Sequence, residues 1–487
     1  AASYKDVNSE FSQVLLSEKS WRQNYARYLP VMMKSAASSS QMAEDIAQQG
    51  LASCYEQFEF LRNGKCYKLN QAMTLFAQPY FRTAHIQGQA EKNTKALSIH
   101  HKGKHLSGDN LRQQVKVWLE KNIIEKSHAV DLLNILSDSN KQDLSGCSFA
   151  LLGASSEIGP ISLLLALGAN IIAIGRENPR NWMRLIRMAR NSPGHLYIPC
   201  NQDTQGMSDN QIAHLAGADL LTQTPEIASW INSFKSPITL GNYAYLDGSD
   251  HVRLTMAMDA IVSRLCEKRD DISLAYLLTP SDVYAVPNTV AINSNNRFYN
   301  KSVSNIFKKI VNVASGGQLF AKSICAQVQD DQGREFGILD NLVPRQGPNY
   351  ALAKRIQRWR AMVSVKKGMR VSCNVAPTSS TQSVMNNHFF AAATLGSESF
   401  GVEVFTPTTA NVLMTLQLVS DIRSEELLER GEALFIHGAN HGGSWHMGYC
   451  FRSVLLPSLI VGMVQKLLPN GNSLDTVKVV NNQQQPA

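Results

Sequence analysis

From residue 146 onward, short apolar runs alternate with stretches of helical pattern. Residues 148–152 form an unbroken apolar run, glycines follow at 153 and 159, and residues 160–168 have the pattern of a buried helix. A second apolar run at 170–174 completes a strand–helix–strand unit, the setting expected of a dinucleotide-binding turn. Later segments continue the alternation, with strands expected at 195–200, 237–246, 272–279 and 369–377 and a helix at 249–269. This alternation predicts an α/β fold with a Rossmann-like, doubly wound parallel sheet.

The first 145 residues carry a different pattern. Residues 20–30, 40–51 and 114–126 are rich in helix-forming residues, and a serine begins the first two of these segments. Residues 84–108 are polar and basic, which favours a loop. We therefore predict a mostly helical N-terminal extension over residues 1–145, followed by a Rossmann-fold domain over residues 146–487.

Charge and hydropathy exclude two classes of partner. The 487 residues include 47 Lys and Arg against 39 Asp and Glu, and the basic residues are scattered, so we expect no nucleic-acid partner. The apolar run at 454–468 is too short to span a membrane and contains Pro457, so we expect no membrane span. We expect an intracellular protein, either cytoplasmic or in an organelle matrix after removal of a targeting peptide.

Cysteine and histidine patterns indicate neither a disulfide framework nor a metal site. None of the eight cysteines belongs to a Cys-x-x-Cys pair, so we expect reduced and mostly buried thiols. His437, His441 and His446 lie close together in the sequence, but no supporting acidic residues are apparent. We therefore predict no metal at these histidines.

The glycine turn after the first apolar run is the candidate cofactor site. Gly153 permits a tight turn, Gly159 permits close packing of helix on strand, and the amides at the helix start would face a pyrophosphate. The second strand ends at Gly175 and Arg176, where a chain that binds NAD would carry an acid. A guanidinium at this place suits the 2′-phosphate of NADP(H). The predicted cofactor contacts here are Gly153, Ser155, Ser156, Ile158, Gly159 and Arg176.

Tyr350 and Lys354 are the candidate catalytic pair. They are four residues apart in a helical run and so share one face of it. A lysine ammonium at that distance lowers the pKa of a phenol, so that the tyrosine can exchange a proton with a substrate oxygen. The apolar run that ends in Ala376-Pro377 follows this helix directly.

The order of these features resembles the short-chain dehydrogenase/reductase family. The glycine turn at 153–159, the Tyr350-x-x-x-Lys354 helix and the following strand carry the resemblance, which extends over residues 146–487. The resemblance is to an atypical member, with an N-terminal extension and with an insertion before the tyrosine. It implies a reductase or dehydrogenase in which Tyr350 is the acid and base and Lys354 holds the cofactor ribose.

The resemblance also implies roles for other residues. In the family a serine at the end of the fifth strand polarises the substrate oxygen, and Ser281 or Thr279 takes that place here. The family's helix asparagine corresponds to Asp259, and its adenine-contacting acid corresponds to Asn201 or Asp203.

The segment after the sixth strand resembles the one that holds the cofactor's carboxamide in the family. Pro377 begins it, and Thr381 stands one position early. Farther along, residues 431–443 resemble the final strand and its glycine-rich exit.

Two departures from the family pattern affect these expectations. Glu157 stands where the family usually has a third glycine, which would place a carboxylate near the phosphates. Gly337 stands at the family's usual spacing of the serine before the tyrosine. We prefer Ser281 or Thr279 for that role, which predicts an insertion at about 283–345 with candidate strands at 288–294 and 308–317.

Two function classes are compatible with the sequence. The first is an NADP(H)-dependent oxidoreductase that interconverts a carbonyl and an alcohol. The second is a catalytically degraded relative that serves as a structural or accessory subunit of a larger assembly, with or without NADP(H). The Tyr350/Lys354 pair favours the first, and the displaced serine and the N-terminal extension favour the second. We expect oligomers, either through the extension or through an apolar stripe of the 249–269 helix formed by Val252, Met256, Ile261 and Leu265.

Overall fold

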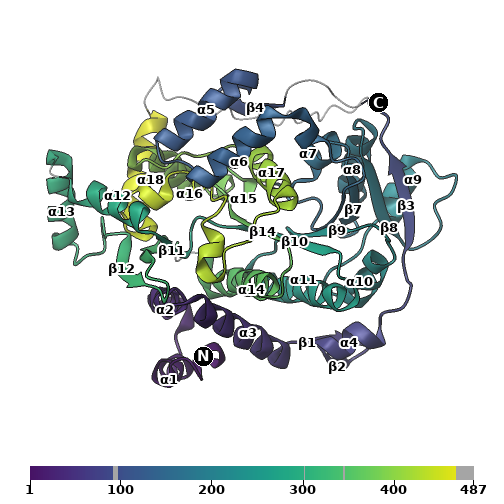
Figure 1. Cartoon of the computed structure of the whole chain (residues 1–487), viewed down its shortest axis with the longest axis horizontal. Coiled ribbons are helices and arrows are strands. Elements are labelled where there is room, and N and C mark those ends of the chain that lie inside the picture. Colours follow the sequence, from purple (N-terminus) through teal and green to yellow (C-terminus); the bar gives the residue numbers. More distant parts are fainter. Residues whose placement is uncertain (92–96, 301, 344–345, 468–487) are drawn as a thin grey trace, which may run out of the picture.

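A seven-stranded sheet runs through the middle of the molecule in the computed structural model (Figure 1). The structure describes residues 1–91, 97–300, 302–343 and 346–467. In spatial order the strands are β14 (Val371–Val375), β10 (Ile272–Leu278), β9 (Ile238–Asn242), β6 (Ser148–Leu152), β7 (Asn170–Ile174), β8 (His195–Cys200) and β3 (Arg82–Gln87). All neighbours are parallel except β3, which pairs antiparallel with β8.

The order of the parallel strands is that of a Rossmann fold. Numbered along the chain from β6, the strands from β8 to β14 follow the order 3-2-1-4-5-6. The strand β6 is buried over its whole length, as expected of a central strand covered on both faces. The predicted fold class is confirmed.

Helices cover both faces of the sheet (Figure 1). One face carries α10 (Thr224–Asn232), α11 (Gly248–Lys268) and α14 (Gly347–Lys366), with α3 (Ser40–Gln57) packed on the outside of α14. The other face carries α7 (Ile161–Ala166), α8 (Pro179–Arg190), α9 (Asp209–Leu215), α17 (Pro407–Arg423), α5 (Gly108–Glu120) and α6 (Lys126–Ser137). Residues before position 146 therefore contribute helices to both layers.

The N-terminal segment contains strands as well as the predicted helices. Its remaining elements are α1 (Ser9–Ser17), α2 (Trp21–Ala36), β1 (Glu59–Arg62), β2 (Lys65–Lys68), α4 (Leu69–Leu75), β4 (Ser98–His101) and β5 (Lys104–Ser107). The expected loop at 84–108 was wrong over β3, β4 and β5, and residues 92–96 lie outside the described part. In β3, Ala84 and Ile86 are buried while their neighbours are exposed, so two apolar residues suffice to place this edge strand.

The region between β10 and α14 forms a small sheet of its own. Strands β11 (Val283–Pro287), β13 (Glu335–Asp340) and β12 (Ile324–Gln329) pair antiparallel in that order, beside α12 (Asn288–Tyr299) and α13 (Val303–Ala314). The strands expected at 288–294 and 308–317 were wrong, because α12 covers the first segment and α13 covers the second up to Ala314, where a turn follows. In α12 the buried residues are Val290, Ala291 and Ser294, a helical spacing.

The expected final strand at 431–443 was also wrong. Residues Gly431–Phe435 and Ser444–His446 form short 3₁₀ turns instead. Gly431, Gly438, Gly442 and Gly443 all have positive φ, which no strand accommodates. The chain then ends its described part in α18 (Phe451–Leu467), which packs on α16 (His388–Ser397) close to the short helix α15 (Gln382–Met385).

Burial removes one of the two surfaces on which an oligomer was expected, the apolar stripe of α11, while the expected contact through the N-terminal extension stays a prediction. Val252, Met256, Ile261 and Leu265 all lie in the core of the chain itself. Among the described residues, no helix is long and apolar enough to cross a bilayer. All eight cysteines are unpaired: Cys54, Cys200, Cys373 and Cys450 are buried, Cys147 and Cys266 are half-buried, and Cys66 and Cys325 are exposed.

Candidate active site

A cavity of about 1230 Å³ opens at the carboxyl ends of the parallel strands. Its walls include the residues that directly follow β6, β7, β9, β10 and β14. The strand order reverses between β6 and β9, and ligands of open α/β sheets bind in the crevice at such a point. The cavity gathers most of the predicted site residues: Gly153, Ser155, Ser156, Ile158, Arg176, Thr279, Ser281, Tyr350, Lys354, Pro377 and Thr381.

Four predicted residues do not line this cavity. Asp259 is buried in an ion pair with Arg360, whose Nε and Nη2 each donate to its carboxylate at 2.7 Å, and the Tyr55 hydroxyl donates to it as well. A buried charge needs such a partner, so the position of Asp259 does not suit the predicted role in catalysis. Asn201 and its alternative Asp203 are both exposed beyond the end of β8. Gly159 lies behind the turn, where its carbonyl accepts a hydrogen bond from Asn411.

The glycine turn has a shape that a side chain would obstruct. Gly153 has a φ of 95°, and a Cβ there would lie 2.4 Å from the backbone nitrogen of Ala244. On the neighbouring strand β9, beside Leu152, Nδ2 of the buried Asn242 has no hydrogen-bond partner. A buried amide without a partner costs free energy unless a ligand completes it. No motif in the sequence singles out Asn242.

Two expectations for this turn change. Helix α7 begins only at Ile161 and has six residues, so the segment between Gly153 and Ile161 is an irregular turn and not the start of a helix. Glu157 directs its carboxylate to the backbone N–H of Gln382, at 3.0 Å and 3.3 Å from its two oxygens. This contact joins the turn to the start of α15. It engages the Glu157 carboxylate, which was expected to lie near the phosphates.

Arg176 and Asp219 line the cavity where it passes the end of β7. Arg176 follows β7, is exposed at the cavity wall, and takes part in no ion pair of the described residues. Asp219 and Leu220 line the cavity where Asn201 was expected. The sequence does not reveal them, because they follow α9 and not a strand, and only the bond from the Ala218 N–H to the Gly175 carbonyl draws them to β7.

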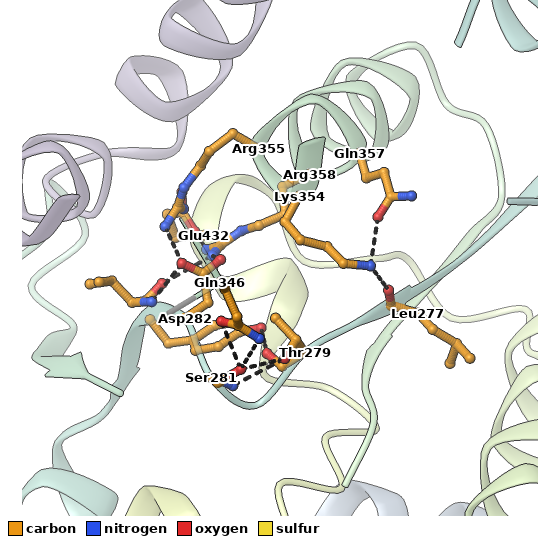
Figure 2. A network of polar contacts seen from close by, with 12 residues as sticks. Leu277, Thr279, Ser281, Asp282, Gln346, Lys354, Arg355, Gln357, Arg358 and Glu432 are labelled. Atoms are coloured by element: carbon orange, nitrogen blue, oxygen red, sulfur yellow. Dashed lines mark hydrogen bonds and ion pairs between the residues drawn. The ribbon is translucent and has the colours of Figure 1, made fainter. Parts of the chain in front are cut away.

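Hydroxyl groups form a chain at the end of β10. The side chains of Tyr350 and Thr279 are hydrogen-bonded, and Thr279 Oγ1 lies 2.7 Å from Ser281 Oγ. The Gln346 amide donates to Ser281 Oγ at 2.9 Å (Figure 2). Gly337 lies away from these groups, in β13 of the small sheet. The tertiary structure therefore places Thr279 and Ser281 beside Tyr350, as the preferred sequence interpretation required.

The pKa of Tyr350 shifts in the direction opposite to the one predicted from its pairing with Lys354. Burial raises the pKa of Tyr350 to about 12, and the hydrogen bond from Thr279 offsets this only in part. Lys354 was expected to lower that pKa, but its ammonium donates to the Leu277 carbonyl at 3.0 Å and to Gln357 Oε1 at 3.1 Å (Figure 2). Burial lowers the pKa of Lys354 itself to about 8. Tyr350 is therefore protonated at neutral pH.

A buried ionic network holds the loop after β10, which carries Thr279 and Ser281, against α14. Asp282, the residue after Ser281, accepts hydrogen bonds from Arg355 at 2.7 Å and from Arg358 at 3.3 Å (Figure 2). Arg358 also pairs with Glu432 and donates to the Val283 carbonyl. All four charged groups are buried. The network ties the loop to the helix that carries Tyr350 and so sets the distance between them.

His251 lies against the face of Tyr350. The two rings stack with centroids 5.5 Å apart, and Tyr245 packs on His251 at 4.7 Å. Both ring nitrogens of His251 are buried without a hydrogen-bond partner, and the residue lines the cavity. Burial lowers its pKa to about 3, so the ring is neutral. Sequence reasoning missed His251, because a histidine in the first turn of a helix has no distinctive pattern.

The fold should lose stability in acid because of this ring. The neutral form is favoured in the folded state, whereas the unfolded chain binds a proton below about pH 6.5. The contribution is therefore complete above pH 6.5 and is lost as pH falls towards 3, with a slope of up to about 1.4 kcal/mol per pH unit. Urea unfolding at pH 7, 6, 5 and 4 should show a shallower decline for His251→Phe than for the parent. Parallel declines would contradict the lowered pKa of His251.

The three C-terminal histidines do have acidic neighbours, which the sequence did not reveal. His437 Nε2 lies 3.1 Å from Asp131 and 3.9 Å from Asp421. His441 Nε2 and His446 Nε2 both reach the same oxygen of Glu125, at 3.1 Å and 3.4 Å.

The hydrogen bonding of His441 disfavours a metal at Glu125. Its Nδ1 accepts from the Gly443 N–H at 3.0 Å, so the proton sits on Nε2 and is donated to Glu125. A metal-ligating histidine normally has the opposite arrangement, with its second nitrogen as a donor. Burial alone would raise the pKa of Glu125, but the bonds from His441 and His446 lower it to about 2.

Comparison with known proteins does not assign this chain to a family. No protein-family model matches this chain, and no curated protein matches it in sequence. Among solved structures, it is similar to a thiolation-reductase di-domain from an archaeal non-ribosomal peptide synthetase. The identity is 11%, the TM-score is 0.32, and the match covers 70% of this chain and 73% of that chain. A likeness at this level carries no argument about function.

Proposed function

We propose that the protein is an NADP(H)-dependent oxidoreductase that interconverts a carbonyl and an alcohol. The observation that carries the proposal is the hydroxyl chain of Tyr350, Thr279 and Ser281 in the same cavity as the glycine turn. A proton donor beside a dinucleotide crevice is the arrangement that carbonyl reduction requires.

The residues of the crevice fit a dinucleotide. Gly153 leaves room for close approach of a ligand, Asn242 offers an unused donor, and Ser155 and Ser156 offer hydroxyls beside the turn. Arg176 is positioned to pair with a 2′-phosphate at the end of β7. Pro377 and Thr381 also line this cavity. NADPH, when bound, supplies the hydride for the carbonyl carbon.

The residues of this chain would supply and hold the proton. Tyr350 is protonated at neutral pH and donates its phenolic proton to the carbonyl oxygen as that oxygen gains charge. Thr279 and Ser281 hold the oxygen by hydrogen bonds, and Lys354 places a positive charge beside the site. The carbon gains the hydride and the oxygen gains the proton, which yields the alcohol. In the reverse direction the tyrosinate accepts the proton.

The direct test is turnover of NADPH with a panel of ketones and aldehydes. The proposal expects absorbance loss at the reduced nicotinamide band that depends on both the protein and a carbonyl compound. NADPH binding by fluorescence titration is measured on the same sample. Tight NADPH binding without turnover of any carbonyl compound would overturn the proposed oxidoreductase activity and favour the structural-subunit alternative.

Arg176→Ala should weaken NADPH binding by about 1–3 kcal/mol, the scale of a charge-assisted hydrogen bond, and leave NADH binding nearly unchanged. Only NADPH carries the phosphate that the guanidinium would hold. Fluorescence titration of both cofactors measures the difference. Arg184→Ala is the matched control, because Arg184 is also an exposed arginine but lies on α8 outside this cavity. Equal losses for both cofactors would contradict the preference for NADP(H).

A further inference from the structure

The cavity also includes a compartment that is bordered by the paired helices α16 and α18. Its walls there include Phe390 and Ala393 of α16 and Phe451, Val454, Leu455 and Ser458 of α18. The whole cavity, about 1230 Å³, exceeds the roughly 300–1,000 Å³ usual for one small-molecule site. It therefore has room for a second molecule next to a dinucleotide.

The two helices that enclose this compartment are locked together. A Cβ on Gly396 would lie 1.9 Å from the Ser458 carbonyl oxygen, and a Cβ on Gly462 would lie 1.9 Å from that of Ala392. Backbones that pack this closely hold the two helices together as one wall of the compartment. The compartment is therefore a preformed part of the fold.

The compartment differs from the rest of the cavity in charge. The charged residues that line the cavity are Arg22, Glu157, Arg176, Asp219, Asp247 and Lys354. None of them belongs to α15, α16 or α18 within the part of the chain that the structure describes. The polar wall groups contributed by these helices, such as Ser397 and Ser458, are uncharged, and an ion placed among them would lose its hydration without a counter-charge.

We infer that this compartment binds the uncharged aliphatic chain of the substrate, so that the substrate class is medium- to long-chain ketones and the corresponding secondary alcohols. The inference rests on the proposed function for the identity of the reacting group. Its own content is the chain-binding compartment, which the walls of α16 and α18 define. The carbonyl would lie at Tyr350, with the alkyl chain directed between Phe390 and Leu455.

The experiment measures binding without turnover. With NADPH bound, an alcohol cannot be oxidised, so calorimetric titration of 2-butanol, 2-hexanol and 2-octanol into the NADPH complex reports affinity alone. Each added methylene should tighten binding by about fourfold, the worth of its transfer from water. Leu455→Asp should weaken 2-octanol at least tenfold and leave NADPH affinity unchanged. Leu456→Asp is the control, because Leu456 neighbours Leu455 on α18 but is 53% exposed and lines no part of the cavity.

The outcomes separate this inference from the proposed function. Equal affinity for the three alcohols, or equal losses in Leu455→Asp and Leu456→Asp, overturns the compartment. Turnover of 2-octanone with NADPH is then measured on the same protein. Affinity that rises with chain length without turnover supports the compartment and overturns the oxidoreductase. Turnover of small ketones without any dependence on chain length supports the oxidoreductase and overturns the compartment.

Discussion

Tyr350→Phe should lower carbonyl reduction by about two to four orders of magnitude, the usual contribution of a positioned acid. The substitution removes only the hydroxyl, so the ring can still stack on His251 and folding should change little. NADPH affinity should be retained, because the proposed cofactor contacts are made by other residues. Steady-state assays with the best ketone of the panel, together with NADPH titration, measure both effects.

Tyr245→Phe is the matched control for this substitution. Tyr245 packs on the same histidine, but its hydroxyl donates to Asp247 and not to Thr279. Its loss should change turnover far less than the loss of the Tyr350 hydroxyl.

Lys354→Met should impair both turnover and NADPH binding, because this ammonium is assigned to the ribose as well as to the proton donor. Near-normal turnover in Tyr350→Phe would show that the acid is another group.

Asp282→Asn should destabilise the fold by about 3–5 kcal/mol, the cost of breaking a buried ion pair from one side. The change keeps the shape of the side chain but removes the carboxylate that pairs with Arg355 and leaves the buried guanidinium of Arg358 with Glu432 alone. Chemical denaturation at pH 7, followed by circular dichroism, measures the loss. The loop that carries Thr279 and Ser281 should also become less ordered, which turnover would register.

The control for Asp282 is an ion pair of the same type at the surface. Asp250 pairs with Arg253 at 3.2 Å, with both side chains more than half exposed. Asp250→Asn should cost less than about 1 kcal/mol, because water already solvates both charges. If Asp282→Asn were as mild as Asp250→Asn, the network would not be what holds the loop to α14.

Local patterns were sufficient where one element carried the information. The apolar runs at 148–152 and 170–174 predicted β6 and β7, because a central parallel strand must be apolar on both faces. The Tyr350–Lys354 spacing predicted a shared helix face, and α14 provides it. Local patterns were insufficient for the edge strand β3, where only Ala84 and Ile86 are buried. They were also insufficient for α12 and α13, because the apolar residues of these helices occur in short runs that resemble strands.

The sequence by itself determined the Rossmann order of strands and helices, the glycine turn and the helix with Tyr350 and Lys354, because backbone period and glycine conformation are local properties. The tertiary structure alone decided which distant side chains meet. It set Thr279 and Ser281 beside Tyr350 although the small sheet and two helices separate them in the chain, paired Asp259 with Arg360, and brought Glu125 to His441. It also decided the direction of the Tyr350 pKa, because desolvation depends on everything packed around the hydroxyl and not on the lysine one turn away.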